Sequence, residues 1–186
     1  MKKSLIVGLA AGAVALFGIA WAAAPVLTAQ ALIRAAKAGD ERKIDSLVDF
    51  PALRESLKSE LNAELVAQMS RDPRVADSGL GGLGMMLAPM LLSGAVDAVV
   101  TPQVVARMVT TAEAPDPDPR SGPEPEDEKA GGKDIHQSWG YRGFNQFAVT
   151  LTERSRPDDH LALILERRGL FTWKLAAVDL QTEAGT

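Results

Sequence analysis

Cysteine is absent from this 186-residue chain, which has only two histidines and one tyrosine. Without cysteine the chain has no disulfide, no thiol nucleophile and no thiolate metal site. An excess of basic charge is also absent, since the net charge is −4 and the sequence pI about 5.2. Nucleic-acid binding therefore has no electrostatic support.

Signatures of catalysis are equally scarce. The chain contains no GxSxG, phosphate-binding loop, HExxH or dinucleotide fingerprint, although 79–84 (GLGGLG) imitates the glycine spacing of the last. His136 and His160 could form a dyad, or a metal site with Asp158 and Asp159, but lone histidines beside loops are usually surface residues. We predict no catalytic residue, no cofactor-binding residue and no metal ligand, and hence no enzyme.

Two aspartates could be read as paired carboxylates for acid–base chemistry, namely Asp40 and Asp49. Helix capping explains both more simply, because each stands directly before a helical pattern. Arg54, five residues after Asp49, could pair with it across the start of the helix.

What the chain does have is a long apolar run at its N-terminus. Residues 4–24 carry no charge, Lys2 and Lys3 precede them, and Pro25 follows. Twenty-one such residues are long enough to cross a bilayer as a helix, which needs about 20. We therefore predict that residues 1–25 are a signal anchor or a signal peptide and that residues 4–24 contact the membrane.

The anchor is favoured over the signal peptide. Small-residue cleavage motifs occur at 20–22 and 22–24, but the run is longer than the roughly 7–15 apolar residues of a signal peptide, and Pro25 would follow the second motif. Trp21 fits an interfacial aromatic belt. The expected location is the inner membrane, single-pass, with the domain in the periplasm; the alternative is export after cleavage.

The orientation rests on few charges. Lys2 and Lys3 favour an N-terminus inside, while Arg34 and Lys37 lie close on the other side of the run. We expect the N-terminus inside and the domain outside.

Helical patterns fill residues 26–112. The first helix is expected to continue from the membrane segment with a break or bend near Pro25, and Gly39 ends it. A short helix follows Asp40, a third begins at Asp49, and Thr101 caps a fourth. The predicted core stripes are Leu27, Ala31, Ala35 and Ala38 with Leu32 and Ile33 beside them, then Leu53, Leu57, Leu61, Leu65 and Met69, then Val104, Val105, Met108 and Val109.

An apolar segment, 79–100, has three readings. It packs as buried or groove-lining helices, it forms a surface that contacts a membrane, a protein partner or an apolar ligand, or it makes a second span. Asp97, Pro89 and the glycines make the last a poor choice.

Residues 113–134 form a boundary. They are rich in proline and acids and contain no large apolar residue, so they cannot bury enough surface to fold. We predict an acidic, Pro-rich disordered loop, and its carboxylates lack the spacing of a calcium loop.

The C-terminal part, 135–182, reads as antiparallel strands. Apolar and polar residues alternate over 143–153, which predicts a strand, and 154–159 forms a turn. An apolar strand is expected over 160–168, and after Gly169 a hairpin partner strand is expected over 170–180. The expected fold class is α+β, a helical half (26–112) packed on a sheet of about three strands, together forming one domain.

A resemblance to a known family covers nearly all of residues 20–180. It is carried by Gly39-Asp40, by 48–51 (VDFP) with Arg54, by Thr101-Pro102 and by 173–175 (WKL). On these residues the chain resembles the bacterial domain-of-unknown-function 2939 family, whose members are membrane-anchored or exported. The family has no assigned activity, so the resemblance implies no functional residue, and the acidic loop looks like an insertion. More distantly, the chain is similar to cystatin-like or nuclear-transport-factor-like α+β rolls.

Two functions remain open. The first is a non-enzymatic, membrane-anchored envelope protein that binds a partner or has a structural role. The second is a periplasmic small-molecule or lipid-binding domain with an apolar pocket. The residues expected to line that pocket are Leu83, Met86, Met90, Phe147 and Trp173.

Overall fold

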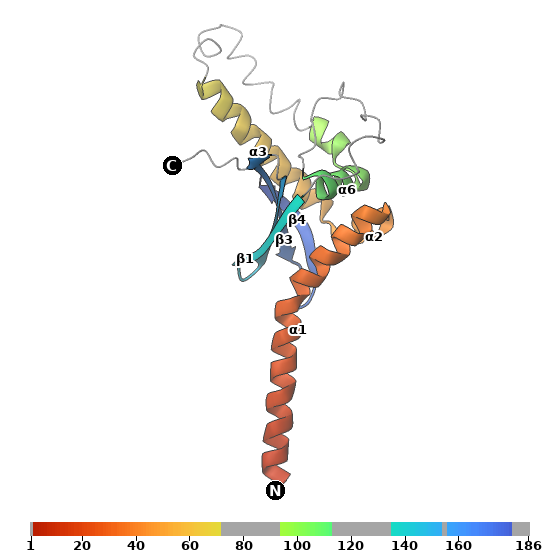
Figure 1. Ribbon diagram of the computed structural model, residues 1–186, viewed down its shortest axis with the longest axis vertical. Helices are drawn as coiled ribbons and strands as arrows, with labels where there is room; N and C mark the ends of the chain where they lie inside the picture. The colour runs from red at the N-terminus through yellow and green to blue at the C-terminus, as the bar shows by residue number, and fades with distance from the viewer. Residues whose placement is uncertain (1, 72–93, 113–134, 154–155, 180–186) are drawn as a thin grey trace.

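The computed structural model describes residues 2–71, 94–112, 135–153 and 156–179, with the backbone alone for 2–7, 64–71, 153 and 156–159. An α+β fold is confirmed: helices come first and a four-stranded antiparallel sheet follows (Figure 1). The helices are α1 (Lys2–Ala38), α2 (Glu41–Leu47), α3 (Phe50–Arg71) and α6 (Pro102–Thr111), and residues 94–99 are also helical. The strands are β1 (Ile135–Gly143), β2 (Gln146–Glu153), β3 (Arg156–Arg167) and β4 (Trp173–Asp179).

The sheet has one strand more than the sequence predicts. Its order is β1-β2-β3-β4, with every neighbouring pair antiparallel. The unpredicted strand is β1, most of which is exposed. Its Ile135, Trp139 and Tyr141 stand at alternate positions, but Gln137 interrupts the row, so the apolar alternation that reveals a half-buried strand is weaker than in β2.

The predicted strand ends also need correction. The turn expected at 154–159 is shorter than predicted, because β3 already begins at Arg156, which pairs with Glu153 of β2.

The second hairpin, between β3 and β4, differs at the start of its last strand. Gly169 lies in the turn as predicted, but β4 begins only at Trp173. Leu170 and Phe171 therefore belong to the turn, and Phe171 does not share a strand face with Trp173 and Leu175.

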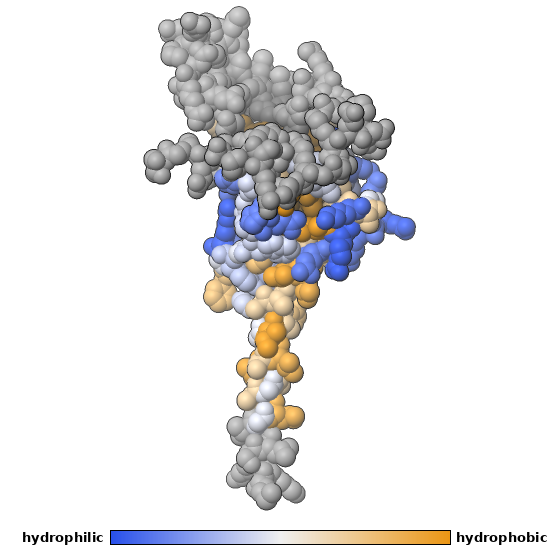
Figure 2. Space-filling model, viewed as in Figure 1, coloured by the Kyte–Doolittle hydropathy of each residue, from blue (hydrophilic) through white to orange (hydrophobic). Residues whose placement is uncertain are grey.

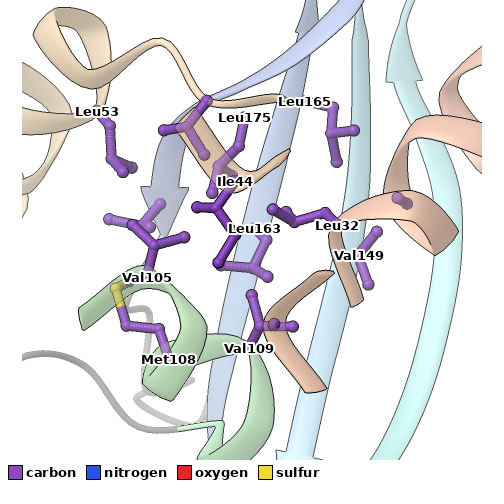
Figure 3. Packing of buried hydrophobic residues seen from close by; sticks show 14 of the residues in the cluster. Leu32, Ile44, Leu53, Val105, Met108, Val109, Val149, Leu163, Leu165 and Leu175 are labelled. Carbon is purple, nitrogen blue, oxygen red and sulfur yellow. The ribbon is translucent and has the colours of Figure 1, made fainter. Parts of the chain in front are cut away.

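The core lies between the helices and one face of the sheet. Strand register places Val149, Leu163 and Val178 in one row of that face, and all three are buried. Figure 3 shows side chains from α1, α2, α3 and α6 meeting this face. The labelled members are Leu32, Ile44, Leu53, Val105, Met108, Val109, Val149, Leu163, Leu165 and Leu175. The apolar faces of helices and sheet bury each other, as a two-layer domain requires.

One helix, α1, connects the apolar N-terminal run to this core. It continues through Pro25 without a break, and Figure 1 shows its axis changing direction between the projecting part and the part beside the sheet. A proline inside a helix removes one hydrogen bond and bends the axis, so the predicted bend has its expected cause. Gly8–Ala38 is long and apolar enough to cross a membrane, a property that a signal sequence shares.

The buried stripe of α1 differs from the prediction. Ala29, Leu32 and Ala36 are buried together with Ala24 and Ala35, whereas Leu27 is 59% exposed. Ala31 is half-buried and Ala38 is exposed. The helix is apolar on all sides near Pro25, so periodicity alone did not mark the face that meets the domain.

The predicted helix starts are confirmed. Oδ1 of Asp40 accepts the N–H of Lys43 at 3.0 Å, and Thr101 Oγ1 accepts that of Val104 at 3.4 Å. Gly39 follows α1 at φ 63°, the left-handed conformation that glycine adopts most readily.

The core stripes of the later helices are confirmed where their side chains are described. In α3 Leu53 and Leu57 are buried and Leu61 packs against the core. In α6 Val105, Met108 and Val109 are buried, and Val104 is partly so. Leu65 and Met69 lie outside the side chains that are described.

The β4 edge of the sheet is covered by the chain between α2 and α3. Val48 forms a parallel bridge with Leu175, and the N–H of Asp49 donates to the Leu175 carbonyl at 2.8 Å. Farther along, Ser56 Oγ donates to the carbonyl of Val178 and accepts its N–H, both at 3.1 Å. These contacts satisfy backbone groups that an edge strand would otherwise leave open.

Several predictions fall on residues beyond the described ranges. The acidic loop 113–134 is one, and most of the apolar segment 79–100 is another. Within 94–100, Val96 and Val100 are buried in the core, and Asp97 pairs with Lys58 of α3 at 2.9 Å. Residues 94–100 therefore agree with the first alternative, in which the segment packs as buried helices.

Candidate functional site

Aromatic side chains gather where α1 leaves the sheet. The chain has nine aromatic residues, and eight of them make ring contacts at this place, which we call the aromatic junction. Its members are Phe17, Trp21, Trp139, Tyr141, Phe144, Phe147, Phe171 and Trp173. They come from α1, from β1 and β2 with their turn, and from β4 with the turn before it. The junction therefore joins the apolar helix to both hairpins.

Arg167, the last residue of β3, lies at the centre of the junction. Its guanidinium carbon is 4.1 Å from the ring centroid of Trp21 and 4.4 Å from that of Trp173. A guanidinium stacks well on aromatic faces, and the attraction grows when water is excluded. One cation is thus held between an indole of α1 and an indole of the sheet.

The same guanidinium also ties the two hairpin turns together. Arg167 donates from Nη1 to the Leu170 carbonyl at 3.0 Å and from Nη2 to the Phe144 carbonyl at 3.2 Å. Its Nε is buried without a hydrogen-bond partner among the described residues. The planar fork of arginine suits this double donation, which the single ammonium of a lysine would not reproduce.

A third contact lies next to Pro25. Because proline has no N–H, the Trp21 carbonyl lacks its usual helical donor. The neighbouring carbonyl, that of Ala22, accepts the hydroxyl of Tyr141 at 2.8 Å. This hydrogen bond connects the bend in α1 to β1, although its two residues are 119 positions apart in the chain.

A charged cluster adjoins the β3–β4 turn. Arg168 Nε donates to Asp49 Oδ2 and its Nη1 to Glu166 Oε2, both at 2.8 Å. Oδ1 of Asp49 also accepts the N–H of Ala52 at 3.3 Å, which confirms the predicted helix cap.

The predicted Asp49–Arg54 pair is wrong. Arg54 instead donates to the Val100 carbonyl at 3.0 Å and lies over the Phe50 ring. A spacing of five turns a side chain away from its partner on a helix, whereas spacings of three or four bring it close.

We predict a pH-dependent contribution from Asp49. The hydrogen bond from Arg168, opposed by desolvation, lowers the pKa of Asp49 from its ordinary 3.8. Its stabilising effect is therefore complete above the unfolded-state pKa and is lost as the pH falls through the lower folded-state value. Asp49→Asn should reduce the free energy of unfolding by about 0.2–1 kcal/mol at pH 7, because asparagine keeps the cap but loses the ion pair. Urea titrations at pH 7 and at a pH well below 3.8 measure this difference.

The control for that experiment is Asp49→Ala. It removes the cap as well and should lower the free energy of unfolding by about 1 kcal/mol more than the asparagine variant. The curves of wild type and Asp49→Asn should converge in acid, and a constant gap would contradict the assigned role.

The two histidines are not brought into direct contact. His136 of β1 is the register partner of Thr152, and Thr152 that of His160 in β3. They share a face, but with a strand between them their Cα atoms are about 10 Å apart. The side chains of Asp158 and Asp159 lie outside the described set. Among the described residues no group of three potential His, Cys, Asp or Glu ligands is found.

The predicted pocket residues have mixed outcomes. Phe147 and Trp173 are 3% and 2% exposed and belong to the core cluster. Leu83, Met86 and Met90 lie outside the described residues, so a pocket with that lining stays a prediction.

Sequence reasoning missed the site because its members are far apart in the chain. The sequence predicts Trp21 only as part of an interfacial belt, and no local pattern marks Arg167. One signal is present in the sequence: eight of the nine aromatic residues lie in the second half of the apolar run or within 139–173.

The sequence profile of a protein family described as protein of unknown function (DUF2939) matches residues 14–108. The match runs from the projecting part of α1 into α6, so the sheet lies beyond it. Comparisons with curated proteins and with solved structures gave no match. Since more than half of the chain is matched, the resemblance of the helical half is confirmed, and the protein belongs to the DUF2939 family.

Proposed function

We propose that this protein is a non-enzymatic, membrane-anchored component of the cell envelope, held in the inner membrane by an uncleaved α1 with its domain in the periplasm. The observation that carries the proposal is the continuity of α1 with the core. The helix passes from exposed apolar residues such as Leu16, 70% exposed, to buried ones such as Leu32, 2% exposed, without interruption. The span and the domain thus share one helix.

Retention of the span is supported by what cleavage would remove. A cut after Ala22 or Ala24 would separate Trp21 from Arg167, leaving that guanidinium stacked on Trp173 alone. A cut after Ala24 would also remove a buried core residue, since Ala24 is 7% exposed. An ordinary signal peptide contributes nothing to the mature fold, whereas this segment contributes packing and a cation–π contact.

A structural or partner-binding role is supported by how the charged groups are used. Asp40 and Asp49 cap helices, and Asp49 is further occupied by Arg168. Both carboxylates thus have a structural use as helix caps, which supports the proposal of a non-enzymatic role. A surface on residues 79–100 that binds a protein partner or an apolar ligand stays a prediction, because most of these residues lie outside the described ranges.

The native protein is expected to keep its N-terminus. Intact-mass spectrometry of material extracted from host membranes should give the full 19.7 kDa chain, and alkaline carbonate should leave it in the membrane pellet. A chain lacking its first 22 or 24 residues, recovered in the soluble fraction, would overturn the anchor.

The matched control is a chimera in which a cleavable signal peptide replaces residues 1–25. This chimera should be released by osmotic shock if the domain faces the periplasm. Protease added to intact spheroplasts should digest the domain of the native protein, and protection would place the domain in the cytoplasm.

A further inference from the structure

Large apolar side chains are exposed at the tips of both hairpins. Phe144, at the β1–β2 turn, is 81% exposed, and Leu170 and Phe171, at the β3–β4 turn, are 59% and 44% exposed. A cluster of exposed apolar residues on a soluble surface commonly marks a contact site. Both turns lie where α1 leaves the body, and Figure 2 shows hydrophobic colour continuing from the projecting helix onto that end.

Contacts with α1 fix the height of these tips along the helix. The Phe171 ring packs edge-on against Phe17, with centroids 5.3 Å apart. The Phe144 ring lies 5.7 Å from that of Trp21. The tips are therefore level with the stretch of α1 between Phe17 and Trp21.

Helix length places that stretch at the edge of a bilayer. Lys2 to Trp21 is twenty helical residues, about 30 Å long, which equals the thickness of the hydrocarbon core. With Lys2 at one surface, Trp21 lies at the other, and Phe17 lies about 6 Å inside it. Apolar faces of interfacial elements bury to about 5–10 Å, so the tips would enter only the interfacial layer.

The charges beside the tips agree with that depth. The tip segments 143–145 and 169–172 contain no charged residue. Arg142 precedes the first, and Arg167 and Arg168 precede the second. Arg142 pairs with Asp179 and Arg168 with Asp49, so these two charges stay on the shoulder of the domain. The guanidinium of Arg167 lies between the indoles of Trp21 and Trp173 and donates to the carbonyls of the two tips. An apolar tip below a charged shoulder suits a membrane surface.

We infer that both hairpin tips insert into the interfacial layer of the bilayer that α1 crosses. The inference rests on the proposed membrane anchor and goes beyond it, since an anchor alone leaves the domain free to tilt on its helix. Three points of contact, α1 and the two tips, set the height and orientation of the domain. Arg167 holds these three points together through Trp21 and the Leu170 and Phe144 carbonyls.

The test uses the absence of cysteine. Single cysteines introduced as Leu170→Cys, Phe144→Cys, Leu16→Cys and Lys43→Cys in the full chain carry an environment-sensitive fluorophore. The labelled proteins are reconstituted in vesicles of phosphatidylethanolamine and phosphatidylglycerol that contain lipids brominated near the headgroup or deep in the acyl chain. Leu16 reports on the span, and Lys43, exposed on α2, reports on the aqueous domain.

The labels at 170 and 144 should lose most of their emission to the shallow quencher and less to the deep one. The label at 16 should respond to the deep quencher, and that at 43 to neither. Melting temperatures equal to that of the unlabelled chain would show that the labels leave the fold intact.

Each contrary result has a distinct meaning. Quenching at 16 without quenching at 170 and 144 would overturn tip insertion and keep the anchor. No quenching at 16 would overturn the anchor itself. An unquenched but concentration-dependent blue shift at 170 would indicate a second copy of the chain on the tips, which also overturns the inference.

Discussion

Replacing Arg167 with alanine is expected to lower the free energy of unfolding by about 2–4 kcal/mol, the combined scale of a desolvated cation–π contact and two charge-assisted hydrogen bonds. The substitution leaves a gap between the indoles of Trp21 and Trp173 and deprives the Leu170 and Phe144 carbonyls of their donor. Denaturant unfolding of the full chain in detergent micelles, followed by near-ultraviolet circular dichroism, measures the change.

The informative control is Arg167→Lys. Lysine keeps the positive charge but has neither the planar surface nor the two-pronged donor geometry, so it should restore only part of the lost stability. Full restoration would mean that charge alone matters. A loss below about 0.5 kcal/mol for Arg167→Ala, the range of ordinary surface substitutions, would show that Arg167 does not clamp α1 to the sheet.

A second large effect is expected from Leu32→Ala in α1. Leu32 is 2% exposed and belongs to the core cluster, so its truncation should lower the free energy of unfolding by about 2–5 kcal/mol. Thermal unfolding of the full chain in micelles, monitored by far-ultraviolet circular dichroism, gives the comparison.

Leu27→Ala is the matched control because it makes the same chemical change in the same helix. Leu27 is 59% exposed, and its truncation should change the free energy of unfolding by no more than about 0.5 kcal/mol. Equal losses at the two positions would contradict the buried stripe through Leu32 and the argument that α1 is part of the domain.

Features that depend on neighbours a few residues apart were predictable. The capping role of Asp40 follows from a hydrogen bond to the third residue after it. The inward face of β2 follows from simple alternation of Phe147, Val149 and Leu151, all of which are buried. The apolar run of α1 needed no more than a count of uncharged residues.

Strand β1 and the bounds of the β3–β4 turn were harder to predict. β1 is mostly exposed and its apolar alternation is interrupted, so its existence depends on pairing with β2. Leu170 and Phe171 have the composition of a strand, but the hydrogen bonds that close the turn at Thr172 leave them outside β4.

The sequence by itself determined that this protein has an apolar helix long enough for a membrane, capped helices and an antiparallel sheet, because each is encoded within a few consecutive residues. Only the tertiary structure decided which face of α1 is buried and that Arg167 joins that helix to two hairpins. The Tyr141–Ala22 and Arg168–Asp49 contacts each link residues 119 positions apart. Such pairings depend on strand register and helix docking, which no local pattern encodes.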